Sequence, residues 1–161
     1  MGGKMEINLP PVWKVFLVST LPIAELRGGI PLACKLGLPV WKGYLSAVAG
    51  NMVPVIPLLL FLEKISQVMS KTHLGKRFFT WLFERTKKRA KIVEELEALG
   101  LALFVAIPLP VTGAWTGSVA AVLFRIRLKL AIISILGGVM LAGIIVSILT
   151  YGGKALISFG R

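Results

Sequence analysis

Acidic side chains are scarce in this chain, and aspartate is absent. Seven glutamates stand against nineteen lysines and arginines, which leaves a formal net charge of +12 at pH 7. There is a single histidine, His73, and a single cysteine, Cys34. One cysteine excludes both an intramolecular disulfide and a multi-cysteine metal site. We therefore expect neither a metal ion nor a cofactor.

The short motifs of soluble enzymes are missing as well. The sequence contains no GxSxG, no HExxH, no Walker A motif and no Rossmann glycine spacing. Each of these motifs places particular catalytic or phosphate-binding groups, so none of the corresponding chemistries has a recognisable site. We expect that the protein is not an enzyme.

Apolar residues, by contrast, are abundant. They make up 56% of the chain, and the mean hydropathy is +0.83. A soluble domain of 161 residues needs a more polar surface than this composition supplies. We therefore predict one integral membrane domain over residues 1–161, with membrane lipid as its surroundings.

The positive charge could indicate binding to nucleic acid, because basic surfaces attract phosphate. Its distribution favours a membrane protein, however. Nine of the nineteen cations lie between Lys64 and Lys91, which is a polar stretch between two apolar regions. Cytoplasmic loops of membrane proteins concentrate lysine and arginine in this way. We expect no nucleic-acid partner.

Two broken apolar blocks alternate with two clean ones. Residues 12–40 and 99–124 are interrupted by prolines and glycines, and the first of them also contains charges. Residues 43–62 and 130–151 carry no charge, and each is long enough to span a bilayer. Pro54 and Pro57 predict a kink in the first clean span.

A shift of 88 residues aligns the two halves, with identities that include Gly29 with Gly117 and Gly50 with Gly138. If residues 99–124 enter and leave the bilayer on one side, Arg125, Arg127 and Lys129 share a face with the cluster at 64–91. The fold class predicted is an all-α membrane protein, built as an inverted repeat of a re-entrant helix hairpin plus a transmembrane helix. Repeat one covers 12–62 and repeat two covers 99–151.

Residues 63–98 join the two repeats as a cytoplasmic connector. Phe78, Phe79, Leu82 and Phe83 fall on one side of a helix, and lysines and arginines surround them. This pattern is typical of an amphipathic helix in the headgroup layer. A solvated charged loop is the alternative.

The first broken block contains the only acid within an apolar region, Glu25, followed by Arg27 and by the pair Gly28 and Gly29. Charged groups at membrane depth are costly and are commonly functional. Glu25 could exchange a proton or a cation, Arg27 could hold an anionic group, and the glycines allow backbone to approach a ligand. The alternative is an ion pair that only fixes the structure.

The second broken block has no charge but offers the hydroxyls of Thr112 and Thr116, the indole of Trp115 and the open backbone of Gly113. If a half-helix begins near Thr112, its N-terminal amides would favour a phosphate or a carboxylate. Close packing of helices through glycine and threonine is the alternative. Asn51, in the first clean span, either lines a cavity or bonds a neighbouring helix.

These residues resemble a family. The segments ELRGGIP, beginning at Glu25, and PLPVTGAWTG, beginning at Pro108, are similar to those of the prokaryotic small multidrug export protein family. That family resembles in architecture the DedA and VTT-domain membrane proteins, in which two re-entrant helices face each other. The wider resemblance implies lipid scrambling and proton-dependent transport. It also implies a role for Arg125, the arginine that follows the second broken block.

The predicted function is a membrane transporter or a lipid and amphiphile translocase, with a midplane site between two re-entrant loops and with possible proton coupling. The substrate would be a small amphiphile or an anionic lipid. We expect a multi-pass homo-oligomer, a dimer, in the prokaryotic plasma membrane. The alternative is a non-transporting membrane scaffold or a small subunit of a membrane complex.

Overall fold

The structure is a computed structural model that describes residues 9–69, 90–108 and 112–159. Every regular element in these ranges is a helix, and none of them contains a strand. The prediction of an all-α protein is therefore confirmed. The middle of the predicted amphipathic connector, residues 70–89, lies outside the described residues.

The first half of the chain forms a short hairpin and then a long, interrupted helix. The hairpin consists of α1 (Pro11–Thr20) and α2 (Glu25–Lys35), and the long helix consists of α3 (Val40–Met52) and α4 (Val55–Met69). At 10 and 11 residues, α1 and α2 are each about 15 Å long. That is about half the thickness of a bilayer's hydrocarbon core.

The interruption between α3 and α4 falls at Val53 and Pro54. Proline has no backbone N–H and its ring crowds the preceding turn, so the ladder of helical hydrogen bonds cannot pass through it. Taken together, Val40–Leu62 are 23 residues with a mean hydropathy of 2.0, long and apolar enough to cross a membrane.

The second half repeats this order. α6 (Ala90–Ala106) and α7 (Ala114–Leu123) form a second hairpin, and α8 (Leu128–Phe159) follows as a single helix. With 32 residues, α8 is about 48 Å long. Its segment Leu128–Ser158 has a mean hydropathy of 2.7 and is the second helix suited to crossing a membrane.

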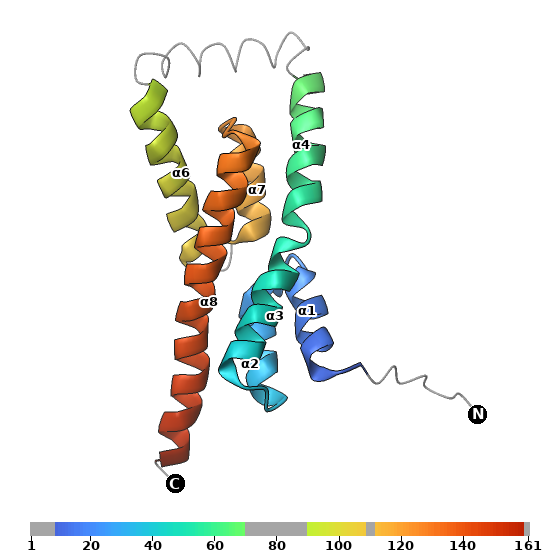
Figure 1. The fold of residues 1–161 in the computed structure, drawn as a ribbon, viewed down its shortest axis with the longest axis vertical. Coiled ribbons are helices and arrows are strands. Elements are labelled where there is room, and N and C mark those ends of the chain that lie inside the picture. The colour runs from blue at the N-terminus through green and yellow to red at the C-terminus, as the bar shows by residue number, and fades with distance from the viewer. Residues whose placement is uncertain (1–8, 70–89, 109–111, 160–161) are drawn as a thin grey trace, which may run out of the picture.

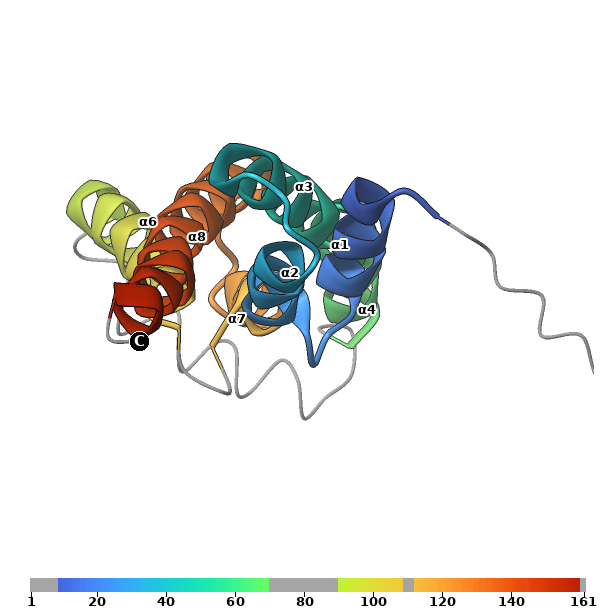
Figure 2. The ribbon, with the colours of Figure 1, turned by 90° about the horizontal axis from the view of Figure 1, so that it is seen from below.

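The two hairpins enter the molecule from opposite ends. Figure 1 shows α1 and α2 beside the lower half of α8, and α6 and α7 beside its upper half. α1 packs against α3, and α6 packs against α8. α2 also contacts α8, and α7 contacts α4, so each hairpin packs on the long helix of the other half. Figure 2 shows α2 and α7 near the centre of this arrangement.

Helix boundaries in the two halves recur at the spacing of the sequence alignment. α3 begins at Val40 and α8 begins 88 residues later at Leu128. α2 ends at Lys35 and α7 ends 88 residues later at Leu123. The connection from α2 to α3 is therefore as long as the connection from α7 to α8.

Those two connections also share a hydrogen-bond pattern. After α2, the N–H of Leu38 donates to the carbonyl of Ala33 at 3.0 Å. After α7, the N–H of Ile126 donates to the carbonyl of Ala121 at 2.9 Å. Each bond, with the shorter one inside it, makes a Schellman motif, which satisfies carbonyl groups left free at a helix end.

Glycines let the helices approach closely at equivalent positions. A Cβ at Gly50 would lie 2.2 Å from the carbonyl oxygen of Phe16, and one at Gly138 would lie 2.6 Å from that of Ala102. Any side chain there would force α1 away from α3, or α6 away from α8. Membrane helices commonly use small residues for such contacts.

Large apolar side chains cover the outside of the long helices. A soluble monomer rarely exposes a continuous apolar surface of this extent, whereas lipid is the natural contact for it. The exposed side chains on α4 and α8 include Ile56, Leu60, Phe61, Ile133, Leu136, Met140, Leu141, Ile144, Ile145, Ile148 and Leu149.

Candidate functional site

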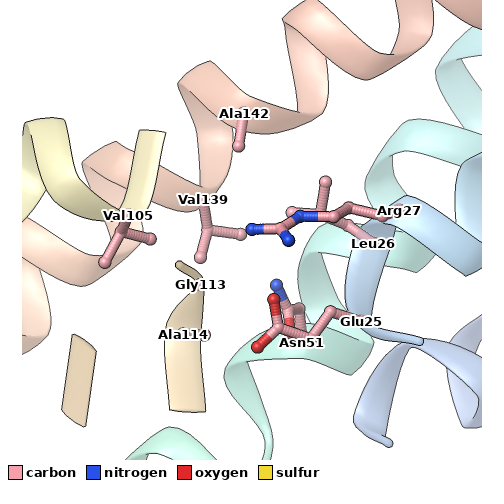
Figure 3. Close-up of a pocket in the computed structure, with 9 residues that line it drawn as sticks. All are labelled: Glu25, Leu26, Arg27, Asn51, Val105, Gly113, Ala114, Val139 and Ala142. Carbon is pink, nitrogen blue, oxygen red and sulfur yellow. The ribbon is translucent and has the colours of Figure 1, made fainter. Parts of the chain in front are cut away.

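A narrow pocket lies between the hairpins, where the N-termini of α2 and α7 meet. Its volume is about 170 Å³, including the part that is open to the outside. This space is too narrow to hold a ligand in this structure. The lining residues, shown in Figure 3, are Glu25, Leu26, Arg27, Asn51, Val105, Gly113, Ala114, Val139 and Ala142.

The carboxylate of Glu25, which belongs to the first hairpin, lies at the N-terminus of α7 in the second hairpin. Its side chain is buried, and its Oε1 accepts a hydrogen bond of 3.3 Å from the backbone N–H of Trp115. The N–H of Ala114 also stabilises the carboxylate. α7 begins at Ala114, and the capping position before it is Gly113, which has no side chain to contribute. Glu25 therefore supplies the negative charge that a helix N-terminus favours.

The backbone of Glu25 is itself unusual. Its φ is 46°, which places a non-glycine residue in the left-handed region at the first position of α2. This conformation costs an L-residue about 1–2 kcal/mol. Such strain persists only where surrounding contacts fix it, and it is frequent at functional sites.

Arg27, in the first turn of α2, is half-buried. Its Nη2 donates to the hydroxyl of Thr112 at 3.3 Å, and Thr112 donates in turn to the carbonyl of Ile107. The opposite charges of Glu25 and Arg27 attract each other across the pocket. The guanidinium is therefore held between the two hairpins, with both of them contributing to its position.

Asn51 has no hydrogen-bond partner in the part of the chain that the structure describes. The residue is only 1% exposed, and neither its amide nitrogen nor its amide oxygen has a partner there. Figure 3 shows the amide beside Glu25 and Arg27, facing the same space. A buried amide without partners is costly, so water or a ligand is the expected partner in the membrane.

Trp115 fixes the relative position of the hairpins. Besides its backbone bond to Glu25, its indole Nε1 donates to the carbonyl of Thr20 at 3.3 Å, at the end of α1. The side chain does not line the pocket. Its role in this structure is to hold α7 against the first hairpin.

Thr112, which contacts Arg27, and four other predicted site residues also lie away from the pocket lining. Gly29 faces Ser19 so closely that a Cβ would overlap the serine hydroxyl, so this glycine serves the packing of α1 on α2. A Cβ at Gly28 would lie 3.0 Å from that of Ala24, the residue before α2. Thr116 donates to the carbonyl of Gly113 within the first turn of α7. Arg125 is the fourth of these residues.

Arg125 lies at the far end of α7 from Gly113. It is exposed and adopts a φ of 53° in the Schellman turn, where the first half has Gly37 with a φ of 72°. Its backbone position is therefore that of a helix C-terminal residue. The structure does not bring it to the pocket.

Sequence reasoning missed the pocket's apolar lining: Leu26, Val105, Ala114, Val139 and Ala142. The internal alignment carried a usable signal, because a shift of 88 places Glu25 on Gly113, Leu26 on Ala114 and Asn51 on Val139. All six of these residues line the pocket. Among the described residues, no three His, Cys, Asp or Glu side chains gather as a metal cluster would require.

These features define a class. Two long helices with exposed aliphatic surfaces, around a buried site that contains a carboxylate, a guanidinium and an unpartnered amide, are the architecture of a membrane protein.

Comparison with known families gives the particular group. Residues 25–145 match the family described as "Putative small multi-drug export protein", and the chain belongs to this family. The match begins at the first residue of α2, includes the second hairpin and ends within α8, so α1 lies outside it. No curated protein and no solved structure matches the chain. The resemblance to DedA and VTT-domain proteins stays a prediction.

Proposed function

We propose that this protein is a multi-pass transporter of the prokaryotic plasma membrane that moves small amphiphilic molecules, anionic lipids included. The pocket between the hairpin turns would be its midplane site. The observation that carries this proposal is the buried grouping of Glu25, Arg27 and the unpartnered amide of Asn51. Such groups are expensive at membrane depth and are retained where a substrate or a proton meets them.

The similarity of the two halves supports this assignment. The halves share helix boundaries, Schellman turns and close glycine contacts at a spacing of 88 residues. Their hairpins point in opposite directions in Figure 1. Many transporters consist of inverted repeats whose broken helices form a central site, and they alternate access when one repeat rocks against the other.

The short hairpins are proposed to be re-entrant. At about 15 Å, neither α2 nor α7 is long enough to cross a hydrocarbon core of about 30 Å. This arrangement would place Lys64, Arg127 and Lys129 at one face, and Lys14, Lys42 and Lys154 at the other. Because the sequence that links α4 to α6 is rich in lysine and arginine, the face at which α4 ends would be cytoplasmic.

Cysteine labelling tests this topology. After Cys34 is replaced by alanine, single cysteines at Lys14, Lys42, Lys64 and Arg127 would be labelled in intact cells with a membrane-impermeant maleimide. We expect labelling at positions 14 and 42, and protection at positions 64 and 127 until the cells are permeabilised. Labelling of positions 14 and 42 from opposite faces would contradict the first re-entrant hairpin.

Transport is proposed to depend on Glu25, because it is the ionisable acid of the pocket. When the purified protein is reconstituted in vesicles, we expect Glu25→Gln to lower the flux of a lipophilic cationic dye or of a fluorescent short-chain anionic phospholipid at least about tenfold. The variant lacks the group that can release a proton while the rest of the site stays in place. Comparison of the two fluxes distinguishes export of drug-like molecules from translocation of lipid.

A membrane scaffold is the second candidate, and one observation favours it. Glu25 and Arg27 both find hydrogen-bond donors or acceptors within the hairpins, as groups that only hold the two halves together would. If the wild-type protein is fully reconstituted in vesicles and moves neither probe, the scaffold function would be supported in place of transport. In either case a homodimer remains part of the proposal.

A further inference from the structure

The N-terminus of α7 is an anion-binding position that the chain fills with its own side chain. α7 has 10 residues, and its capping position, Gly113, offers no side-chain acceptor. The first N–H groups of the helix therefore face the pocket, and the carboxylate of Glu25 receives the one from Trp115 at 3.3 Å. Helix N-termini commonly bind carboxylate, phosphate or sulfate groups.

Asn51 indicates independently that the pocket takes a ligand. Its amide is 1% exposed and has no partner within the described ranges, although it borders Glu25 in the pocket. The equivalent position of the second half is Val139, which also lines the pocket. A span at this depth can therefore pack without an amide, and the Nδ2 of Asn51 is available as a hydrogen-bond donor.

Arg27 adds a positive charge. Its guanidinium has five N–H donors, of which Nη2 reaches Thr112 at 3.3 Å. Among the residues that line the pocket, Glu25 and Arg27 alone are charged; α3, α6, α7 and α8 contribute uncharged side chains. The carboxylate of Glu25 therefore balances the charge of Arg27, and it would repel a second negative charge, that of an entering anion.

We propose that the α7 N-terminus, Arg27 and Asn51 form an oxyanion-binding subsite in which Glu25 acts as a built-in competitor. An external carboxylate, phosphate or sulfonate group takes the place of the Glu25 carboxylate, which takes up one proton as the anion enters. One anion and one proton then occupy the site together. This inference deepens the proposed transport function and rests on it for its biological use.

The test uses the full-length protein in nanodiscs with a fluorescent alkyl sulfonate, whose charge is constant between pH 5 and pH 8. We expect the Kd of the wild type to rise about tenfold per pH unit above the range in which Glu25 is protonated. Glu25→Gln removes the competitor, so at pH 8 it should bind at least about tenfold more tightly than the wild type and lose the pH slope. An unchanged or weaker Kd in Glu25→Gln overturns the proposal.

A second variant covers the case in which Glu25→Gln folds poorly. Asn51→Leu has a similar shape and no donor, so we expect binding about tenfold weaker at pH 5, with a thermal midpoint no lower than that of the wild type. Ser147→Ala is the matched control, because Ser147 is another buried, unpartnered polar residue that does not line the pocket. Equal binding by the Asn51 and Ser147 variants overturns the proposal.

Inorganic sulfate distinguishes the two sources of the anion. Competition by free sulfate at a concentration similar to that of the sulfonate supports a subsite for inorganic anions, and competition only by alkyl sulfonates supports one for amphiphile head groups. Vesicle flux without sulfonate binding would overturn this subsite and leave the transport function standing. Sulfonate binding with the expected variant pattern, but without flux of any probe, would support the subsite and remove the transport function.

Discussion

Gly113→Ala is expected to lower transport by about two orders of magnitude without unfolding the protein. A Cβ at Gly113 would lie 1.9 Å from the Oε2 of Glu25, so both cannot occupy their present positions. The carboxylate is the end of a flexible side chain and moves, whereas the backbone stays. At a φ of 167°, Gly113 has an extended conformation that alanine adopts readily.

The size of this effect follows from what Glu25 loses. A hydrogen bond to a charged group contributes about 1.5–3 kcal/mol, and a helix N-terminus adds about 0.3–1 kcal/mol. Each 1.4 kcal/mol is a factor of about ten, which gives roughly a hundredfold. The measurement is the initial rate of dye flux in vesicles. Gly137→Ala is the control, because a Cβ at that position meets nothing within 4 Å; equal rates for the two variants would contradict the role given to Glu25.

Asn51→Leu is expected to make the protein more stable and less active. Leucine has nearly the same shape as asparagine, and it removes two buried polar atoms that have no partner among the described residues. Relief of an unsatisfied buried group is worth about 1–3 kcal/mol of unfolding free energy. Loss of the amide removes a ligand contact of similar size, so transport should fall about tenfold or more. Stability and function are commonly opposed at such positions.

Thermal unfolding in detergent, followed by size-exclusion chromatography, measures the first half of this prediction, and vesicle flux measures the second. Asn51→Asp tests the same position with an added charge and should lower both stability and transport. A decrease in thermal midpoint for Asn51→Leu would mean that the amide has a structural partner, and the ligand-binding role would then be wrong.

Much of the fold was predictable from the sequence. The clean spans were visible because lipid-facing helices need long uncharged stretches, and the prolines and glycines of 12–40 and 99–124 correctly indicated interrupted structure. Internal alignment placed the two halves at a spacing that the helix boundaries share. The extent of α6 was less visible, because Lys91, Glu94, Glu95 and Glu97 give its first turns the composition of a polar connector.

The site was predicted in pieces rather than as a whole. Glu25 and Arg27 drew attention as charges in an apolar block, and a helix start near Thr112 was expected to attract an anion. That the anion is Glu25 itself could not be predicted, because the contact spans 90 residues and depends on how two hairpins pack. Val105, Val139 and Ala142 were missed because apolar residues in a membrane protein carry no chemical signal.

The two halves of this protein are similar in shape but unlike in chemistry. The first half contributes a carboxylate, a guanidinium and an amide, while the second half contributes a bare helix end at the matching position. A chimera of two first halves would set two carboxylates against each other, and a chimera of two second halves would leave two helix dipoles with no counterion. The two halves are therefore complementary at the site, and neither could take the place of the other.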